Sequence, residues 1–162
     1  MADPFAKIHR LLRAGMHSEA LRLIYDRERY ALRTPYDGDP NHGWYVVGDI
    51  LFKKGRFLDS AYAFQLSVES DPDDPQAHMA LANAHSAAGD PTKAETSLRA
   101  ALYLDPANPE ILFNLGNALF DQEKYSECVS VYREIGKNDP TLYTQAQKNL
   151  KLAGDRMKHK RL

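Results

Sequence analysis

The chain has 162 residues and a 43% hydrophobic content, enough for one domain with a sizeable core. Its 21 basic and 22 acidic residues nearly cancel, which argues against a nucleic-acid-binding or membrane-surface protein. No apolar run approaches the roughly 18 residues of a transmembrane helix. The N-terminal segment lacks the features of a signal peptide, and a single cysteine, Cys128, excludes an internal disulfide. We therefore expect a cytoplasmic protein.

Residues 1–34 predict two short helices that match the repeats further along the chain only weakly. Apolar or small residues stand at the expected positions: Ile8, Leu11, Gly15, Ala20 and Ile24. Pro4 and Lys7 interrupt the pattern, as is usual for the terminal unit of a repeat array. Residues 35–40 are rich in turn formers, so we expect an insertion loop there.

The central part of the chain is an internal repeat. A fixed interval of 34 residues separates three Asp-Pro pairs: Asp71-Pro72, Asp105-Pro106 and Asp139-Pro140. A period of this length indicates a stacked repeat array. Counting from these pairs divides residues 41–142 into three repeats, 41–74, 75–108 and 109–142. Position 1 of each repeat is therefore Asn41, Pro75 or Pro109.

Each repeat predicts two amphipathic helices. The apolar stripes of the third repeat are Leu112, Leu115, Gly116 and Leu119, then Cys128, Tyr132 and Ile135. These steps of three and four residues are typical of one helix face. Asp74 and Asn108 each precede a proline, which predicts a side-chain cap followed by proline at the first helical position.

Residues 143–162 predict one further amphipathic helix and a short basic tail. Its apolar face consists of Tyr143, Ala146, Leu150, Ala153 and Met157. We expect this helix to cap the last repeat.

The repeats resemble the tetratricopeptide repeat (TPR), whose pattern is Trp-x2-Leu-Gly-x2-Tyr, then Ala-x3-Phe, then Pro. The first repeat carries Trp44, Val47, Gly48, Leu51, Ser60, Phe64 and Pro72. The second carries His78, Leu81, Ala82, His85, Ala94, Leu98 and Pro106, and the third Leu112, Leu115, Gly116, Leu119, Cys128, Tyr132 and Pro140. The resemblance implies an all-α, right-handed α-solenoid of antiparallel helix pairs, about nine helices including the C-terminal cap.

The resemblance also implies that the first helix of each repeat lines a concave groove. Large apolar residues occupy groove positions 5 and 12: Tyr45, Met79, Phe113, Phe52 and Phe120. Position 9 carries Asp49, Asn83 and Asn117, and position 6 of the third repeat carries Asn114. Asparagine donates and accepts hydrogen bonds, so it suits the backbone of a bound peptide. Two alternatives stay open: the chain's own termini cover the aromatic residues, or asparagine is simply common at this position.

The groove does not match the TPR class that clamps the acidic C-terminus of heat-shock chaperones. That clamp needs lysine and arginine for charge-assisted bonds to carboxylates. The corresponding residues here are Tyr45, Asp49, Ala80, Glu110 and Asn114. We therefore predict no partner of this class.

No pattern of residues predicts catalysis, a metal or a cofactor. Metal-binding and phosphate-loop spacings are absent. His78 and His85 occupy packing positions, and Cys128 falls where paired helices approach closely, so a buried structural thiol is expected.

The sequence therefore predicts a non-catalytic interaction scaffold or chaperone-like adaptor that binds a peptide or amphipathic segment in its groove. In size the chain is similar to the TPR chaperones of bacterial secretion translocators. The alternative is a self-assembling homo-oligomeric scaffold that uses its N-terminal end or convex face.

Overall fold

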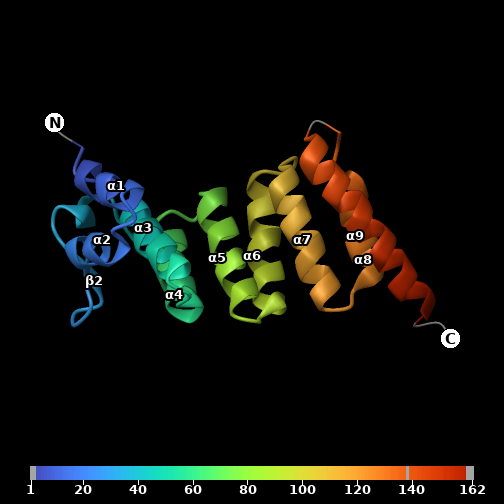
Figure 1. Cartoon of the computed structure of the whole chain (residues 1–162), viewed down its shortest axis with the longest axis horizontal. Helices are drawn as coiled ribbons and strands as arrows, with labels where there is room; N and C mark the ends of the chain where they lie inside the picture. The colour runs from blue at the N-terminus through green and yellow to red at the C-terminus, as the bar shows by residue number, and fades with distance from the viewer. Residues whose placement is uncertain (1–2, 138, 160–162) are drawn as a thin grey trace. The chain divides into compact units, whose positions relative to one another are not determined.

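The computed structural model describes residues 3–137 and 139–159, in two compact units, Met1–Asp73 (unit 1) and Asp74–Leu162 (unit 2). Nine α-helices contain most of these residues (Figure 1), which confirms the predicted helical class. No helix in this part of the chain combines the length and hydropathy needed to span a bilayer. Residues 160–162 of the predicted basic tail lie outside the described residues.

Unit 1 begins with two short helices, α1 (Ala6–Arg13) and α2 (His17–Ile24). A small antiparallel hairpin follows, β1 (Tyr25–Asp26) and β2 (Ala31–Leu32), with Tyr25 opposite Leu32. A 3₁₀ turn, η1 (Tyr36–Gly38), leads into the helix pair α3 (Pro40–Lys53) and α4 (Phe57–Ser70). The insertion predicted at 35–40 is thus preceded by a hairpin that the sequence did not predict.

The hairpin replaces the second half of a helix for a local reason. Oδ1 of Asp26 accepts hydrogen bonds from the backbone amides of Glu28 and Arg29, at 3.1 and 3.2 Å. Such an Asx turn offers the backbone an alternative to helical bonds. Tyr30 completes the reversal with a φ of 50°. Helix α2 therefore has eight residues, whereas α4 has 14.

Unit 2 consists of two complete helix pairs and a longer last helix (Figure 1). The pairs are α5 (Pro75–Ala87) with α6 (Pro91–Leu104) and α7 (Pro109–Asp121) with α8 (Tyr125–Glu134). The last helix, α9 (Pro140–His159), packs against α8 and α7. It starts three residues before the predicted capping helix, because Pro140 stands at its first position.

An acidic or amide side chain followed by proline starts five of these helices. The capping residues are Asp39, Asp74, Asp90, Asn108 and Asp139, and each accepts a bond from an amide of the following turn. These bonds satisfy backbone amides that no helical carbonyl can reach. The Asp-Pro and Asn-Pro pairs therefore place the helix starts.

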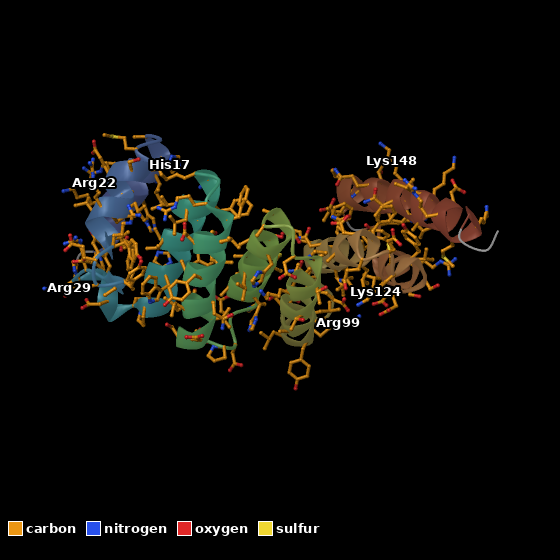
Figure 2. The ribbon with its side chains drawn as sticks, turned by 90° about the horizontal axis from the view of Figure 1, so that it is seen from below. His17, Arg22, Arg29, Arg99, Lys124 and Lys148 are labelled. Carbon is orange, nitrogen blue, oxygen red and sulfur yellow. The ribbon has the colours of Figure 1, made fainter. Side chains whose placement is uncertain are left out.

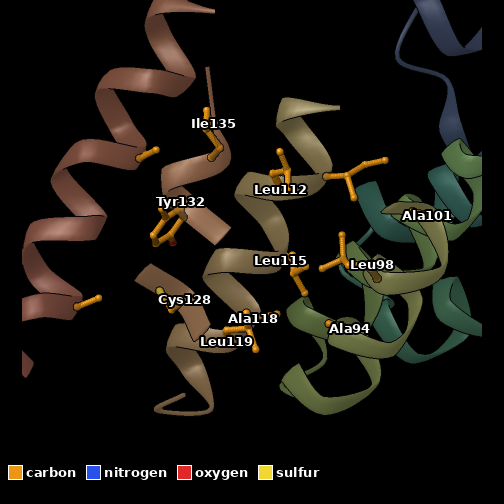
Figure 3. Packing of buried hydrophobic residues seen from close by; sticks show 14 residues of the cluster. Ala94, Leu98, Ala101, Leu112, Leu115, Ala118, Leu119, Cys128, Tyr132 and Ile135 are labelled. Carbon is orange, nitrogen blue, oxygen red and sulfur yellow. The ribbon is translucent and has the colours of Figure 1, made fainter. Parts of the chain in front are cut away.

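Close contact between paired helices depends on small residues at repeat position 8. A Cβ atom added to Gly48 meets Cδ1 of Phe64 at 2.7 Å, and one added to Gly116 overlaps the Tyr132 ring. Both rings stand at position 24 of their repeats. Figure 3 shows the Tyr132 ring between α8 and its neighbours, in a cluster that also buries Cys128. Burial raises the pKa of the Cys128 thiol to about 11, which keeps it protonated.

The turn between α7 and α8 contains a strained residue. Gly55 and Gly89, at repeat position 15, have φ values of 71° and 81°, and Glu123 holds the equivalent position with a φ of 59°. A left-handed conformation costs a residue with a side chain about 1–2 kcal/mol, whereas glycine adopts it freely.

We therefore expect Glu123→Gly to raise the free energy of unfolding of unit 2 by about 0.5–1 kcal/mol, after the larger chain entropy of glycine is deducted. Urea unfolding followed by circular dichroism measures it. Gly89→Ala is the reciprocal control and is expected to lower stability by about 1 kcal/mol. A neutral or destabilising Glu123→Gly would contradict this account of the turn.

Candidate functional site

Asparagines on the first helices of unit 2 pair across neighbouring helices. Nδ2 of Asn114 on α7 donates to Oδ1 of Asn83 on α5, 3.2 Å away. One turn further along α7, Oδ1 of Asn117 accepts from Nδ2 of Asn149 on α9, also at 3.2 Å. We name these four residues the asparagine row. It brings the predicted Asn83, Asn114 and Asn117 together on one face.

In each pair of the asparagine row, the bond within the pair uses neither the Nδ2 group of one residue nor the Oδ1 atom of the other. Oδ1 of Asn83 and Oδ1 of Asn117 accept bonds within the pairs, but their Nδ2 groups have no partner among residues 3–137 and 139–159. Within the same residues, Asn114 and Asn149 use their Nδ2 groups and keep Oδ1 available. The row therefore alternates donors and acceptors, as an extended peptide backbone requires.

A buried tyrosine holds the second pair in place. The hydroxyl of Tyr132 on α8 donates to Oδ1 of Asn117 at 2.6 Å and accepts from Nδ2 of Asn149 at 3.2 Å. Tyr132 is fully buried, and this burial raises the pKa of its hydroxyl. The hydroxyl thus stays a neutral donor. Asn117 consequently serves both the packing of its own repeat and the asparagine row.

A hollow of about 420 Å³ lies beside this pair in unit 2. It is lined by Asn117, Phe120, Asp121, Tyr132, Asn149 and Leu152. The volume falls in the range of roughly 300–1,000 Å³ seen for ligand pockets. Phe120 and Leu152 supply apolar walls, and the amides of the row supply one polar edge. The hollow therefore has room for one large side chain.

The predicted aromatic anchors pair with rings on the second helix of their own repeat. At position 5 the ring centroids are 5.3 Å apart for Tyr45–Phe64 and 6.0 Å apart for Phe113–Tyr132. At position 12 they are 5.2 Å apart for Phe52–Phe57 and 5.3 Å apart for Phe120–Tyr125. We name these four contacts the ring pairs. Every predicted anchor in them is half-buried, so part of each ring serves packing within the repeat.

The remaining predicted residues differ in their surroundings. Asp49 on α3 of unit 1 forms an ion pair with Lys53 one turn along, at 2.7 Å. Met79 on α5 is half-buried against the core of unit 2. Tyr45, Asp49 and Phe52 all lie on α3, and their role in binding stays a prediction.

Among the described residues, no group of three or more His, Cys, Asp or Glu side chains could hold a metal ion.

Two residues of this site were missed by the sequence reasoning. Asn149 continues the asparagine row, and Leu152 forms a wall of the hollow. A strict 34-residue step from Asn114 points to Lys148, one residue before Asn149. Asn149 could therefore be predicted as part of the row only if the repeat spacing was allowed to shift by one residue in the last helix.

Comparison with known proteins supports the repeat assignment. Residues 79–142 match the family model described as tetratricopeptide repeat. The cytochrome c-type biogenesis protein CycH of Bradyrhizobium diazoefficiens is 26% identical over 135 residues, which is 82% of this chain and 36% of the relative. The type IV pilus assembly protein PilF of Pseudomonas aeruginosa is 29% identical over 131 residues, 78% of this chain and 51% of the relative. The chain thus spans about a third to a half of the length of these relatives.

A solved structure shows the same fold with a peptide present. The Yersinia enterocolitica type III secretion chaperone SycD, in complex with a peptide of the translocator YopD, matches with a TM-score of 0.66. The match is 20% identical and covers 72% of this chain and 93% of that chain. At this identity the likeness shows the fold alone. The family match therefore assigns residues 79–142 to the tetratricopeptide repeat, and the likeness to the solved structure shows that the chain has the same fold.

Proposed function

We propose that this chain is a non-catalytic adaptor or assembly chaperone, and that unit 2 binds an extended peptide segment of a partner along the asparagine row. The observation that carries the proposal is the alternation of available amide donors on Asn83 and Asn117 with acceptors on Asn114 and Asn149. A partner peptide that is bound through its backbone in this way needs no particular amino-acid sequence. One large side chain of the segment enters the hollow between Phe120 and Leu152.

The known proteins similar to this chain support the proposal. The relatives named above are biogenesis and assembly proteins, and the SycD structure contains a peptide of its translocator. The predictions that the chain is cytoplasmic and that it does not take the acidic C-terminus of heat-shock chaperones remain part of this proposal. Met79 and Phe113 of unit 2 are proposed as additional contacts with the segment. For unit 1 taken by itself, we propose that Tyr45, Asp49 and Phe52 of α3 contact a partner.

Isosteric Asn→Asp changes test the row most sharply. Asn83→Asp with Asn117→Asp keeps the acceptors that Asn114, Asn149 and Tyr132 use but removes the two available donors. We expect the affinity for a partner peptide to fall about 10- to 100-fold, since each lost hydrogen bond contributes about 1 kcal/mol or somewhat more. A partner captured with the wild-type chain supplies the peptide, and calorimetric titration measures the affinity.

A control variant separates lost donors from added charge. Ser126→Asp with Gln147→Glu adds the same two charges at exposed positions outside the asparagine row. It is expected to bind like the wild type, and both variants are expected to keep the wild-type melting temperature. Equal affinity of the row variant and the wild type for the captured partner would refute the proposal. Alanine at Asn117 is less suitable, because it leaves the buried Tyr132 hydroxyl without its acceptor.

Self-assembly remains the alternative. Two large apolar side chains on second helices favour it, Leu58 on α4 and Tyr103 on α6, which are 77% and 85% exposed. Sedimentation distinguishes the two, because a monomer at all concentrations leaves only the adaptor function.

A further inference from the structure

Unit 1 contains a second pocket, which the proposed function does not use. Its volume is about 320 Å³, and residues of the hairpin, α3 and α4 line it: Tyr25, Arg27, Tyr30, Trp44, Val47, Leu51, Arg56, Asp59, Tyr62 and Ala63. We name it the hairpin pocket. All of its lining residues belong to unit 1, so it is separate from the asparagine row and its hollow.

The pocket exists because α2 ends early. Helix α2 stops after eight residues, six fewer than α4, which corresponds to about 9 Å of missing helix. In unit 2, Leu112 and Leu119 of α7, at positions 4 and 11, are buried in one cluster with residues of α6 (Figure 3). At position 4 of α3, Trp44 is only half-buried. The pocket is therefore the space beside α3 that a full-length α2 would fill.

Four aromatic side chains converge on this space. The rings of Tyr25 and Trp44 meet edge to face with centroids 5.9 Å apart. Tyr30 and Tyr62 are 65% and 55% exposed, although both are large aromatic residues. Burial raises the pKa of the Tyr25 hydroxyl, and Tyr30 adds to the effect. Aromatic side chains with polar tips dominate the centres of binding surfaces, because they offer large contact area and hydrogen bonds together.

The charges of the pocket favour an anionic occupant. Arg56 makes two bonds of 2.7 Å to the same carboxylate oxygen of Asp59, so these two charges compensate each other. Arg27, on the hairpin, has no partner within residues 3–137 and 139–159. One guanidinium therefore faces the pocket uncompensated. A guanidinium pairs best with a carboxylate, which it can contact through two parallel bonds.

We propose that the hairpin pocket binds an acidic peptide segment of a partner protein, with one aromatic side chain against Trp44 and Tyr62 and a neighbouring carboxylate on Arg27. This site goes beyond the backbone binding proposed for unit 2. It recognises side chains of the partner, namely an aromatic ring next to a carboxylate, at a separate place on the same chain.

Trp44 is the only tryptophan, so its fluorescence reports on this pocket alone. The probe is the blocked peptide Glu-Asp-Phe-Asp-Glu, titrated into the full chain. We expect a saturable change in Trp44 emission below about 1 mM, the weak end of specific binding. Replacing the four acids by their amides, or Phe by Ala, is expected to abolish the change.

Matched variants locate the binding. Arg27→Gln and Tyr62→Ala are each expected to weaken the affinity for the probe about fivefold, a change appropriate to one exposed ion pair or one ring contact. The controls are Arg29→Gln, on the outer edge of the same hairpin (Figure 2), and Tyr103→Ala, an exposed tyrosine of α6. Both controls are expected to bind like the wild type.

Three results would overturn the inference. They are the absence of a saturable change in Trp44 emission, an equal loss of affinity in Arg27→Gln and Arg29→Gln, and undiminished binding of the peptide whose acids are replaced by amides. The row variant of unit 2 is expected to leave this titration unchanged. Failure of the pocket and failure of the asparagine row are therefore distinguishable.

Discussion

Gly116→Ala is expected to lower the free energy of unfolding of unit 2 by about 3 kcal/mol, at the upper end of the range for overpacking. Alanine in a helix is ordinarily about 1 kcal/mol better than glycine. Here the added methyl group overlaps the Tyr132 ring, with Cδ1 only 2.7 Å from the new Cβ. The ring cannot move away easily, because it is fully buried and its hydroxyl is bonded to Asn117 and Asn149.

Urea unfolding followed by circular dichroism measures this effect, and the chain offers a matched control. No atom of residues 3–137 or 139–159 lies within 4 Å of a Cβ added to Gly154 on α9, so Gly154→Ala is expected to raise stability by up to about 1 kcal/mol. A similar loss in both variants would show that the Tyr132 contact is not the cause.

The second repeat suggests a partial rescue. It combines Ala82 at position 8 with Leu98 at position 24, and both are buried. The variant Gly116→Ala with Tyr132→Leu reproduces this combination in the third repeat. We expect it to be at least about 1 kcal/mol more stable than the sum of the single changes predicts. Strict additivity would argue against direct contact as the source of the cost.

Glu95→Gln is expected to destabilise unit 2 by about 2–3 kcal/mol at pH 7. Glu95 on α6 is buried, which opposes its ionisation, yet bonds from Lys124, Gln122 and Arg99 outweigh burial and lower its pKa from 4.5 to about 2. The bonds from Lys124 and Gln122 are 2.7 and 2.8 Å long and join α6 to the turn before α8. Figure 2 shows Arg99 and Lys124 on this part of unit 2.

The pH dependence has a definite sign. A depressed pKa in the folded state stabilises at pH values above about 4.5, and this contribution disappears as the pH falls towards 2. The gap in stability between the wild type and Glu95→Gln should therefore narrow between pH 5 and pH 3, which unfolding series at several pH values measure. Glu127→Gln removes the exposed second partner of Arg99 and is expected to change stability by less than about 0.5 kcal/mol. A gap that is constant with pH would contradict the assigned role of the Glu95 carboxylate.

The helix starts were predictable because their determinants are local. Asp74 and Asn108 each combine a capping oxygen with a following proline, and these features act within one turn. The hairpin at residues 25–32 was not predictable in the same way. Residues 1–34 match the repeat weakly and suggest a helix pair, but the bonds that Asp26 accepts from the amides of Glu28 and Arg29 divert the chain. Apolar spacing alone does not show that competition.

Most residues of the candidate site were predictable from the sequence, but the hydrogen bonds between them were not. The repeat frame selected Asn83, Asn114 and Asn117, and the structure brings them to one face of unit 2. Their bonds to one another, and the bond from Tyr132 to Asn117, depend on the distances between packed helices. Those distances follow from tertiary contacts that no spacing along one helix contains.

The ring pairs have a consequence for how the proposed binding preference can diverge in this protein. Phe113 and Phe120 are half-buried against Tyr132 and Tyr125, so a mutation that alters their exposed side also disturbs the packing beneath them. Asn83 has no such constraint, because it is exposed and, among the described residues, its side chain bonds only to Asn114. Evolutionary drift in the proposed ligand preference should therefore proceed through Asn83 and leave the rings nearly invariant. Alanine scans of the rings will, for the same reason, report lost folding as lost affinity.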